Sequence, residues 1–328
     1  MYLFLCMESL DSLDRKILFE MDKNSRQSIS QLAKKLKKNR NVVQYRIKSL
    51  EQKGIIKKYV ATLDPGALGL TAWNVYLEFQ NLNPDIEQRI IEFLNKRKNV
   101  WWIALTTGRW NLIYSIVVKN VKDFYYTVRG FNEQFGSYIL NQSLASHVEI
   151  DIFSRSYLVD SESDCSPWFK TYDKVHLNDS DRYILKKIAT NARLSSVDLA
   201  LSLDMTSTTV SRRIKELVKK GVIAKFRLFL DVSKYGYTYY KILVHLKNIS
   251  EHGDKELKEY CRKLGNIFHY EKKIGPWMLE LEMDELNYAN VYHSMKRMKE
   301  TFPQYISSFE IMIIYQEYKG EMDLSTVL

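Results

Sequence analysis

A short segment near the start of the chain mixes cations and amides on what would be the solvent face of one helix. Val43, Ile47 and Leu50 recur at helical spacing, which predicts an inward apolar stripe. The residues left facing solvent are Arg40, Asn41, Gln44, Tyr45, Lys48 and Gln52. Cations bind phosphate groups and amides make paired hydrogen bonds to base edges, so these residue types at this spacing favour nucleic-acid binding.

Two further helices and a strand are predicted to position this helix. Apolar residues over 13–21 recur at helical spacing, and Ser30 can cap a second short helix. Asn39 can cap the third helix, which ends at Gly54, where a positive φ costs little. A strand follows, so the order is that of a winged helix-turn-helix.

The same stretch recurs 167 residues later. Between residues 13–57 and 180–224, 18 of 45 aligned positions are identical and no gap is needed. The offset persists downstream, where Trp110 matches Trp277. A gap-free match over that length predicts a tandem duplication of one two-domain unit.

The second part of each copy has the pattern of a ferredoxin-like sandwich. Alternation at Val75, Leu77 and Phe79 indicates a half-buried strand, and Pro84 starts a helix. We therefore predict an α+β fold in which a winged helix-turn-helix is followed by a ferredoxin-like βαββαβ sandwich, the pair being present twice in tandem. The predicted parts are winged helices at 9–64 and 176–231, ferredoxin-like (RAM-type) domains at 65–158 and 232–322, and a linker at 159–175.

The linker between the copies is expected to be exposed. Residues 160–166 are polar and acidic, and Pro167 interrupts any regular element. Trp168 and Phe169 can attach its far end to a domain.

Positive charge is concentrated on the two predicted helix-turn-helix units. The net charge of the chain is +10. Residues 11–62 carry +9 and residues 178–229 carry +6, so the remainder is mildly acidic at −5. An isolated basic helix usually only improves solubility, but an excess that recurs in both copies of one motif is typical of a surface that binds a polyanion.

Cysteine usage and hydropathy favour a cytoplasmic protein without membrane association. Cys6, Cys165 and Cys261 are far apart and form no C-x-x-C pair, which favours free thiols in a reducing compartment. No apolar run approaches the roughly 18 residues of a membrane span. The apolar leader at residues 1–8 is expected to pack on a partner. The six histidines show no metal-ligand spacing, so we predict no catalytic residue, no metal and no cofactor.

These features resemble the Lrp/AsnC, or feast/famine, family of prokaryotic transcription regulators. The first copy carries L-D-R-x-I-L at 13–18, L-A-x-x-L at 32–36 and V-x-x-R-I-K-x-L-x-x-x-G-I-I at 43–56. The second copy keeps D-R-x-I-L at 181–185 and V-x-x-R-I-K-x-L-x-x-x-G-V-I at 210–223. The resemblance implies binding of double-stranded DNA by the third helix, self-association through the ferredoxin-like sheets, and often a small amino-acid effector. Family members usually have one unit per chain, so the fused pair is a departure.

By position, the resemblance assigns DNA contacts to both third helices. Arg46 and Arg213, with the nearby lysines, are expected to bind phosphates. Asn41 and Gln44 suit adenine, and Arg40 or Arg212 suits guanine, at about 1–3 kcal/mol of discrimination each. The assigned residues are Asn39, Arg40, Asn41, Gln44, Tyr45, Arg46, Lys48, Thr206, Ser207, Thr208, Ser211, Arg212, Arg213 and Lys215.

The sequence departs from the family pattern at two kinds of turn. Lys37 and Asp204 stand where the family commonly has glycine before the third helix. The family often has a T-G-x-(aromatic)-D turn between the middle strands, on the side where the effector is expected. Here this turn retains Thr107 and Gly108 but has Asn111 in place of the aspartate, and the second copy lacks this polar group. The alternative for this turn is that Gly108 only permits a hairpin.

Alternatives for function and assembly remain open at the level of sequence. A sequence-specific DNA-binding regulator is the leading hypothesis, and the others are a siroheme-decarboxylase-like enzyme of haem biosynthesis and a low-specificity architectural DNA-binding protein. Each ferredoxin-like sheet is expected to leave an apolar face lined by residues such as Trp73, Trp102 and Tyr114. These faces could pair within one chain as a pseudo-dimer or between two chains.

Overall fold

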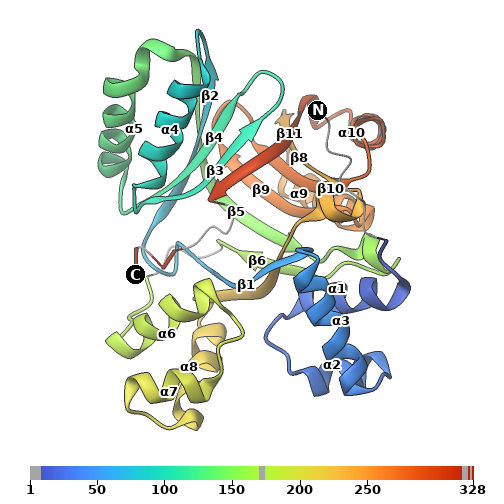
Figure 1. The fold of residues 1–328 in the computed structure, drawn as a ribbon. Helices are drawn as coiled ribbons and strands as arrows, with labels where there is room; N and C mark the ends of the chain where they lie inside the picture. Colours follow the sequence, from blue (N-terminus) through green and yellow to red (C-terminus); the bar gives the residue numbers. More distant parts are fainter. Residues whose placement is uncertain (1–8, 170–173, 320–323, 326) are drawn as a thin grey trace.

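The computed structural model has two helical heads beside a common β structure (Figure 1). The structure describes residues 9–169, 174–319, 324–325 and 327–328. The leader at residues 1–8, which we expected to pack on a partner, lies outside these. Among the described helices, none is both long and apolar enough to cross a bilayer.

Each head is a three-helix winged helix-turn-helix, as predicted. The turn before each third helix keeps a left-handed residue although it has no glycine, since φ is 51° at Lys37 and 49° at Asp204. The helices are α1 (Ser12–Lys23), α2 (Ile29–Leu36) and α3 (Arg40–Gln52) in the first head, and α6 (Asp179–Thr190), α7 (Ser196–Leu203) and α8 (Ser207–Lys219) in the second.

Side-chain caps explain where these helices begin. Asn39 and Thr206 cap α3 and α8, as expected. The cap of α2 is Ser28 and not Ser30. Ser28 Oγ accepts a hydrogen bond from the Gln31 N–H, and the Gln31 side chain accepts one from the Ser28 N–H. This reciprocal capping box needs a glutamine or glutamate three residues after the cap, and only Ser28 has one.

The two heads are joined to each other by an antiparallel strand pair. β1 (Ile56–Leu63) pairs with β7 (Ile223–Leu230). A further bond between the heads runs from the Ala192 N–H to the Tyr59 carbonyl at 2.7 Å. Because β1 and β7 directly follow α3 and α8, this pairing fixes the separation of the two third helices.

The two ferredoxin-like parts close one barrel within the chain. The strand order is β2-β4-β3-β11-β8-β10-β9-β5, and β5 also pairs with β2. The pairs β3–β11 and β5–β9 connect the copies, so the sheets form an intrachain pseudo-dimer. The elements are β2 (Thr71–Phe79), α4 (Pro84–Asn95), β3 (Val100–Thr106), β4 (Leu112–Val118), α5 (Val121–Phe135) and β5 (Ile139–Phe153), then β8 (Thr238–Leu246), α9 (Glu251–Leu264), β9 (Ile267–Ile274), β10 (Leu279–Glu285), α10 (Tyr288–Thr301) and β11 (Ile306–Lys319).

Helices cover the outer face of the barrel, with α4 and α5 on the first copy (Figure 1). Trp73 and Tyr114 pack on this covered face, so their expected place on the open sheet face was wrong. The Trp73 ring stacks on Phe124 of α5 with centroids 4.4 Å apart, and Tyr114 lies 5.4 Å from Phe131. Trp102 does belong to the buried cluster between the copies.

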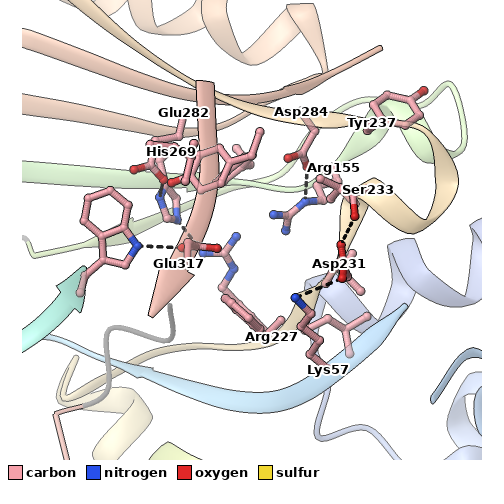
Figure 2. A pocket seen from close by; sticks show the side chains of 18 of the residues that line it. Lys57, Arg155, Arg227, Asp231, Ser233, Tyr237, His269, Glu282, Asp284 and Glu317 are labelled. Atoms are coloured by element: carbon pink, nitrogen blue, oxygen red, sulfur yellow. Dashed lines mark hydrogen bonds and ion pairs between the residues drawn. The ribbon is translucent and has the colours of Figure 1, made fainter. Parts of the chain in front are cut away.

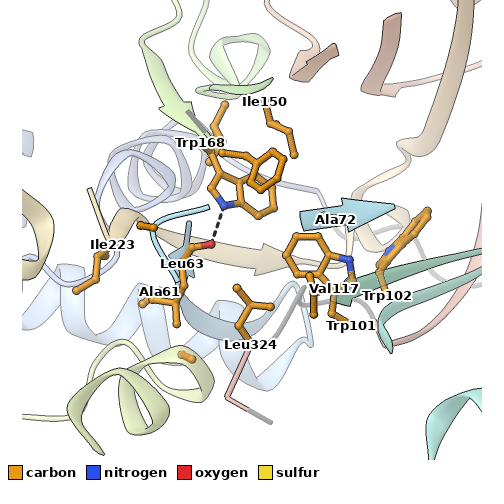
Figure 3. Packing of buried hydrophobic residues seen from close by; sticks show 14 of the residues in the cluster. Ala61, Leu63, Ala72, Trp101, Trp102, Val117, Ile150, Trp168, Ile223 and Leu324 are labelled. Atoms are coloured by element: carbon orange, nitrogen blue, oxygen red, sulfur yellow. Dashed lines mark hydrogen bonds between the residues drawn. The ribbon is translucent and has the colours of Figure 1, made fainter. Parts of the chain in front are cut away.

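The segment between the copies is mostly exposed over residues 160–167, and Trp168 and Phe169 attach its far end to the core, both as expected. Pro167 was expected to interrupt regular structure but lies within a short strand. β6 (Cys165–Trp168) pairs with the end of β5. Trp168 and Phe169 are buried, and the Trp168 indole N–H donates to the Leu63 carbonyl at 2.8 Å. Figure 3 shows Trp168 among apolar side chains from both copies, including Ile223.

Candidate nucleic-acid interface and interior cavity

The third helix of the first head presents most of its predicted contacts to solvent. Arg40, Asn41, Tyr45 and Lys48 are exposed, and Gln44 is half-buried. The helix therefore offers two cations, two amides and an aromatic ring on its outer face. This combination suits phosphates and base edges.

Arg46 and Arg213, expected to bind phosphates, form ion pairs within their own heads. Arg46 Nη1 lies 2.8 Å from Asp11 Oδ2 and 3.3 Å from Asp14 Oδ2. Arg213 Nη1 lies 2.9 Å from Asp181 Oδ1. An aspartate 32 residues before the arginine recurs in both copies, and this recurrence is the sequence signal for the pairing. Both arginines hold the third helix against the first.

The third helix of the second head has a different face. Thr208 and Arg212 are exposed, and Ser207 and Ser211 are half-buried. Arg212 Nη1 also lies 2.6 Å from Glu216 Oε1 one turn along the helix. This face is rich in hydroxyl groups where the first is rich in amides, so the two heads are expected to prefer different base pairs.

A hollow of about 520 Å³ lies between the two heads. Arg26 and Lys35 line it from the first head, and Ser211 and Lys215 of α8 line it from the second. No acidic side chain is among the described residues that line it. A cationic hollow beside a reading helix suits a phosphate backbone.

The residues predicted to bind an effector make structural hydrogen bonds. Asn111 Oδ1 accepts a bond from the Phe79 N–H at 2.7 Å, and Thr107 Oγ1 accepts one from the Ile313 N–H at 3.2 Å. Gly108 has a φ of 92°, which suits the hairpin turn. None of these three residues lines the cavity of about 620 Å³ between the heads and the barrel.

A cavity of about 620 Å³, which we call the head–barrel cavity, lies between the strand pair β1–β7 and the barrel (Figure 2). Arg155 and Arg227 point into it. Arg155 Nε lies 2.7 Å from Asp284 Oδ2, and its Nη1 lies 3.1 Å from Asp22 Oδ1, so Arg155 connects β10 to α1. Arg227 Nη1 lies 2.6 Å from His269 Nε2. Sequence patterns alone did not identify this site.

A buried ionic network occupies the barrel interior next to the cavity. Lys241 Nζ lies 2.7 Å from Glu282 Oε1 and 2.9 Å from Glu280 Oε2, and Lys273 Nζ lies 2.8 Å from Glu271 Oε2. Burial raises the pKa of Glu271 to about 7. For Glu280 and Glu282 burial acts in the same direction, but Lys241 and their other partners outweigh it, so their pKa values are lowered.

His269, Glu271 and Glu282 are close enough to share a metal ion, since their ligand atoms lie within 4.8 Å of one another. However, His269 Nδ1 lies 2.6 Å from Glu282 Oε2, and Lys241 pairs with the same carboxylate. Burial lowers the pKa of His269 to about 4, so the neutral ring donates to Glu282 and accepts from Arg227. Lys241 and Lys273 therefore already provide these carboxylates with the positive charge that a metal ion would supply.

Comparisons with known proteins agree with the duplicated fold. A family described as winged helix-turn-helix DNA-binding matches residues 10–57 and 177–224. An uncharacterized HTH-type transcriptional regulator of Pyrococcus horikoshii is 31% identical over 119 residues, covering 35% of this chain and 78% of that protein. The crystal structure of a siroheme decarboxylase has a TM-score of 0.63 at 14% identity and covers 94% of this chain and 93% of its own. Its complex with an iron-uroporphyrin III analogue has a TM-score of 0.61, with the same identity and coverage. At this identity the likeness concerns the fold alone.

Proposed function

Because the chain belongs to the HTH-type transcriptional regulators, in a form that carries the Lrp/AsnC-like unit twice, we propose that it is a sequence-specific regulator that binds double-stranded DNA with both heads of one chain. The observation that carries the proposal is the β1–β7 pair, which holds α3 and α8 in one body with their polar faces exposed. We propose that the protein acts as a regulator and not as an enzyme, and that it acts in the cytoplasm. Thr107 and Asn111 already bond the backbone, so we place no effector there.

The proposed contacts follow from exposure and chemistry. Lys48 and Lys215 bind phosphates, which adds affinity and salt dependence without base preference. Asn41 and Gln44 suit adenine, and Arg40 suits guanine. The two ion-paired arginines act as positioning residues for the reading helices.

Selection of bound duplexes from a random pool tests this proposal. We expect enriched sites with two unlike half-sites at one constant spacing, because the reading faces differ and the strand pair fixes their separation. Competition by random DNA should be weak for a regulator and strong for an architectural protein. Failure to retain any duplex at low salt, or retention without enrichment, would refute the proposal.

A second candidate is a decarboxylase that acts on an iron tetrapyrrole. It is favoured by the fold likeness to a siroheme decarboxylase, which extends over 94% of this chain, whereas the Pyrococcus regulator matches 35%. Fold alone does not carry chemistry. Addition of siroheme separates the two candidates. A decarboxylase should shift the Soret band and release carbon dioxide, whereas a regulator without this activity should release none.

A further inference from the structure

The duplication places two equivalent spaces between the heads and the barrel, and only one of them is filled by side chains. One space is the apolar cluster in Figure 3, which Trp168, Phe169 and Leu324 help to fill. The other is the head–barrel cavity in Figure 2, which keeps a volume of about 620 Å³. Trp102 and Trp168 belong to both, because each packs in the cluster and lines the cavity.

Substitutions between the copies account for this difference. Four positions that line the cavity have charged or ionisable side chains where the other copy, 167 residues earlier, has apolar ones. Burial of ionisable groups costs free energy, so their concentration in one of two equivalent spaces points to a binding site. The pairs are Arg227 with Val60, His269 with Trp102, Asp284 with Val117, and Glu317 with Ile150. Trp102, Val117 and Ile150 belong to the apolar cluster, whereas Val60 lines the cavity, as Trp102 also does.

The acidic groups at the cavity have partners in the structure. Asp284 Oδ2 lies 2.7 Å from Arg155 Nε. Glu317 Oε1 accepts a hydrogen bond from the Trp102 indole N–H at 2.7 Å. Burial raises the pKa of Glu317 to about 7, so this group carries only part of a negative charge near neutral pH. Glu282 is bound within the ionic network. Because these carboxylates already have partners, the cavity does not favour a cationic ligand.

Arg227 is different, because part of its hydrogen-bonding capacity is unused. Its side chain lies inside the protein, with the whole residue 8% exposed, and its Nε makes no hydrogen bond. The carboxylate of Asp22 is 4.0 Å from that atom. Figure 2 shows the Arg227 guanidinium directed into the cavity near that of Arg155. A buried guanidinium with an unused donor favours an anionic ligand.

The cavity walls favour a flat ligand. The aromatic residues that line them include Trp102, Trp168, Tyr237, Tyr239 and Phe268. Flat rings next to guanidinium groups favour stacking with a conjugated ring system. The volume falls within the range of about 300–1,000 Å³ found for small-molecule sites. We infer that the head–barrel cavity binds a planar conjugated carboxylate whose carboxylate group pairs with Arg227. This inference does not depend on DNA binding.

Pyrene-1-carboxylate is a suitable probe because it is flat and carries one carboxylate. Titrated into the full chain, it should quench the tryptophan emission, to which Trp102 and Trp168 of the cavity wall contribute, and saturate at one molecule per chain. Arg227→Gln should weaken binding by about ten- to hundredfold, the effect of losing a hydrogen bond to a charged group. Arg227→Lys should recover part of the affinity. Arg129→Gln, on the exposed face of α5, is the matched control and should bind like the wild type.

A neutral probe keeps the test independent of any variant. Pyrene-1-methanol should bind the wild type at least tenfold more weakly than the carboxylate. Equal affinity of the two probes, equal affinity of Arg227→Gln and the wild type, or no saturable binding would overturn the inference. Thermal melting of each variant without a probe verifies the fold. Duplex retention, measured separately, keeps the failure of the proposed regulator distinguishable from failure of this site.

Discussion

Replacement of Asp22 by asparagine would test whether buried ion pairs hold the first head to the barrel. Asp22 is fully buried in α1, with Oδ1 at 3.1 Å from Arg155 Nη1 and 4.0 Å from Arg227 Nε. Arg155 in turn pairs with Asp284 of β10. Asparagine keeps the shape of the side chain but removes the charge. Arg155 would still pair with Asp284, whereas Arg227 would lose the nearby carboxylate of Asp22.

Removal of one partner of a buried ion pair costs about 3–5 kcal/mol, and we expect the lower end because Asp284 still compensates Arg155. Each kcal/mol shifts the melting temperature of a large domain by about 2–4 °C, so Asp22→Asn should lower the Tm by about 6–12 °C at pH 7. Circular dichroism melting measures this shift. Asp85→Asn, at an exposed position of α4, is the matched control and should change the Tm far less.

The pH dependence of this shift gives a second test. Burial raises the pKa of Asp22, but Arg155, Arg227 and Lys225 outweigh burial, so the pKa lies below its ordinary value. The stability that depends on ionised Asp22 is therefore fully present above the unfolded pKa of about 4 and is lost as the pH falls toward the folded value. The Tm difference between wild type and Asp22→Asn should be constant from pH 5 to 8, to within about 2 °C, and shrink below about pH 4. A difference that is negligible at pH 7, or that does not shrink in acid, would refute the reasoning.

Three further predictions follow from the heads and the core. Trp168→Ala should lower the free energy of unfolding by about 3–5 kcal/mol, because a buried ring and its bond to the Leu63 carbonyl are lost, and an unchanged melting curve would place this segment outside the core. Lys48→Ala and Lys215→Ala should each reduce the slope of log K against log salt by about 0.9 without changing the selected sequence, and an unchanged slope in salt titrations would exclude phosphate contacts there. Arg46→Ala should change that slope less than Lys48→Ala, because Arg46 is engaged with α1, and an equal loss in the same titrations would show that it binds phosphate.

Local patterns in the sequence determined the order and type of the elements. The apolar stripe of Val43, Ile47 and Leu50 predicts α3, and Pro84 marks the start of α4. Such signals depend on residues a few positions apart, so they can be recognised without knowledge of the fold. The constant offset between the copies also predicted that each element would appear twice. Even here a cap was misplaced, because Ser28 and Ser30 both suit that position and only the reciprocal bond to Gln31 distinguishes them.

Only the tertiary structure decided where the alternating charges of the second copy lie. On β10, Leu281 and Met283 pack under the helices, while Glu280, Glu282 and Asp284 alternate with them. In an isolated sheet this alternation indicates a solvent face, because charged side chains normally remain in water. The pairs β3–β11 and β5–β9 join strands that are distant along the chain and close the barrel over that face. Closure of the barrel therefore buries the face that the alternation predicts to be exposed. Its charged side chains form the ionic network, and the head–barrel cavity lies beside it.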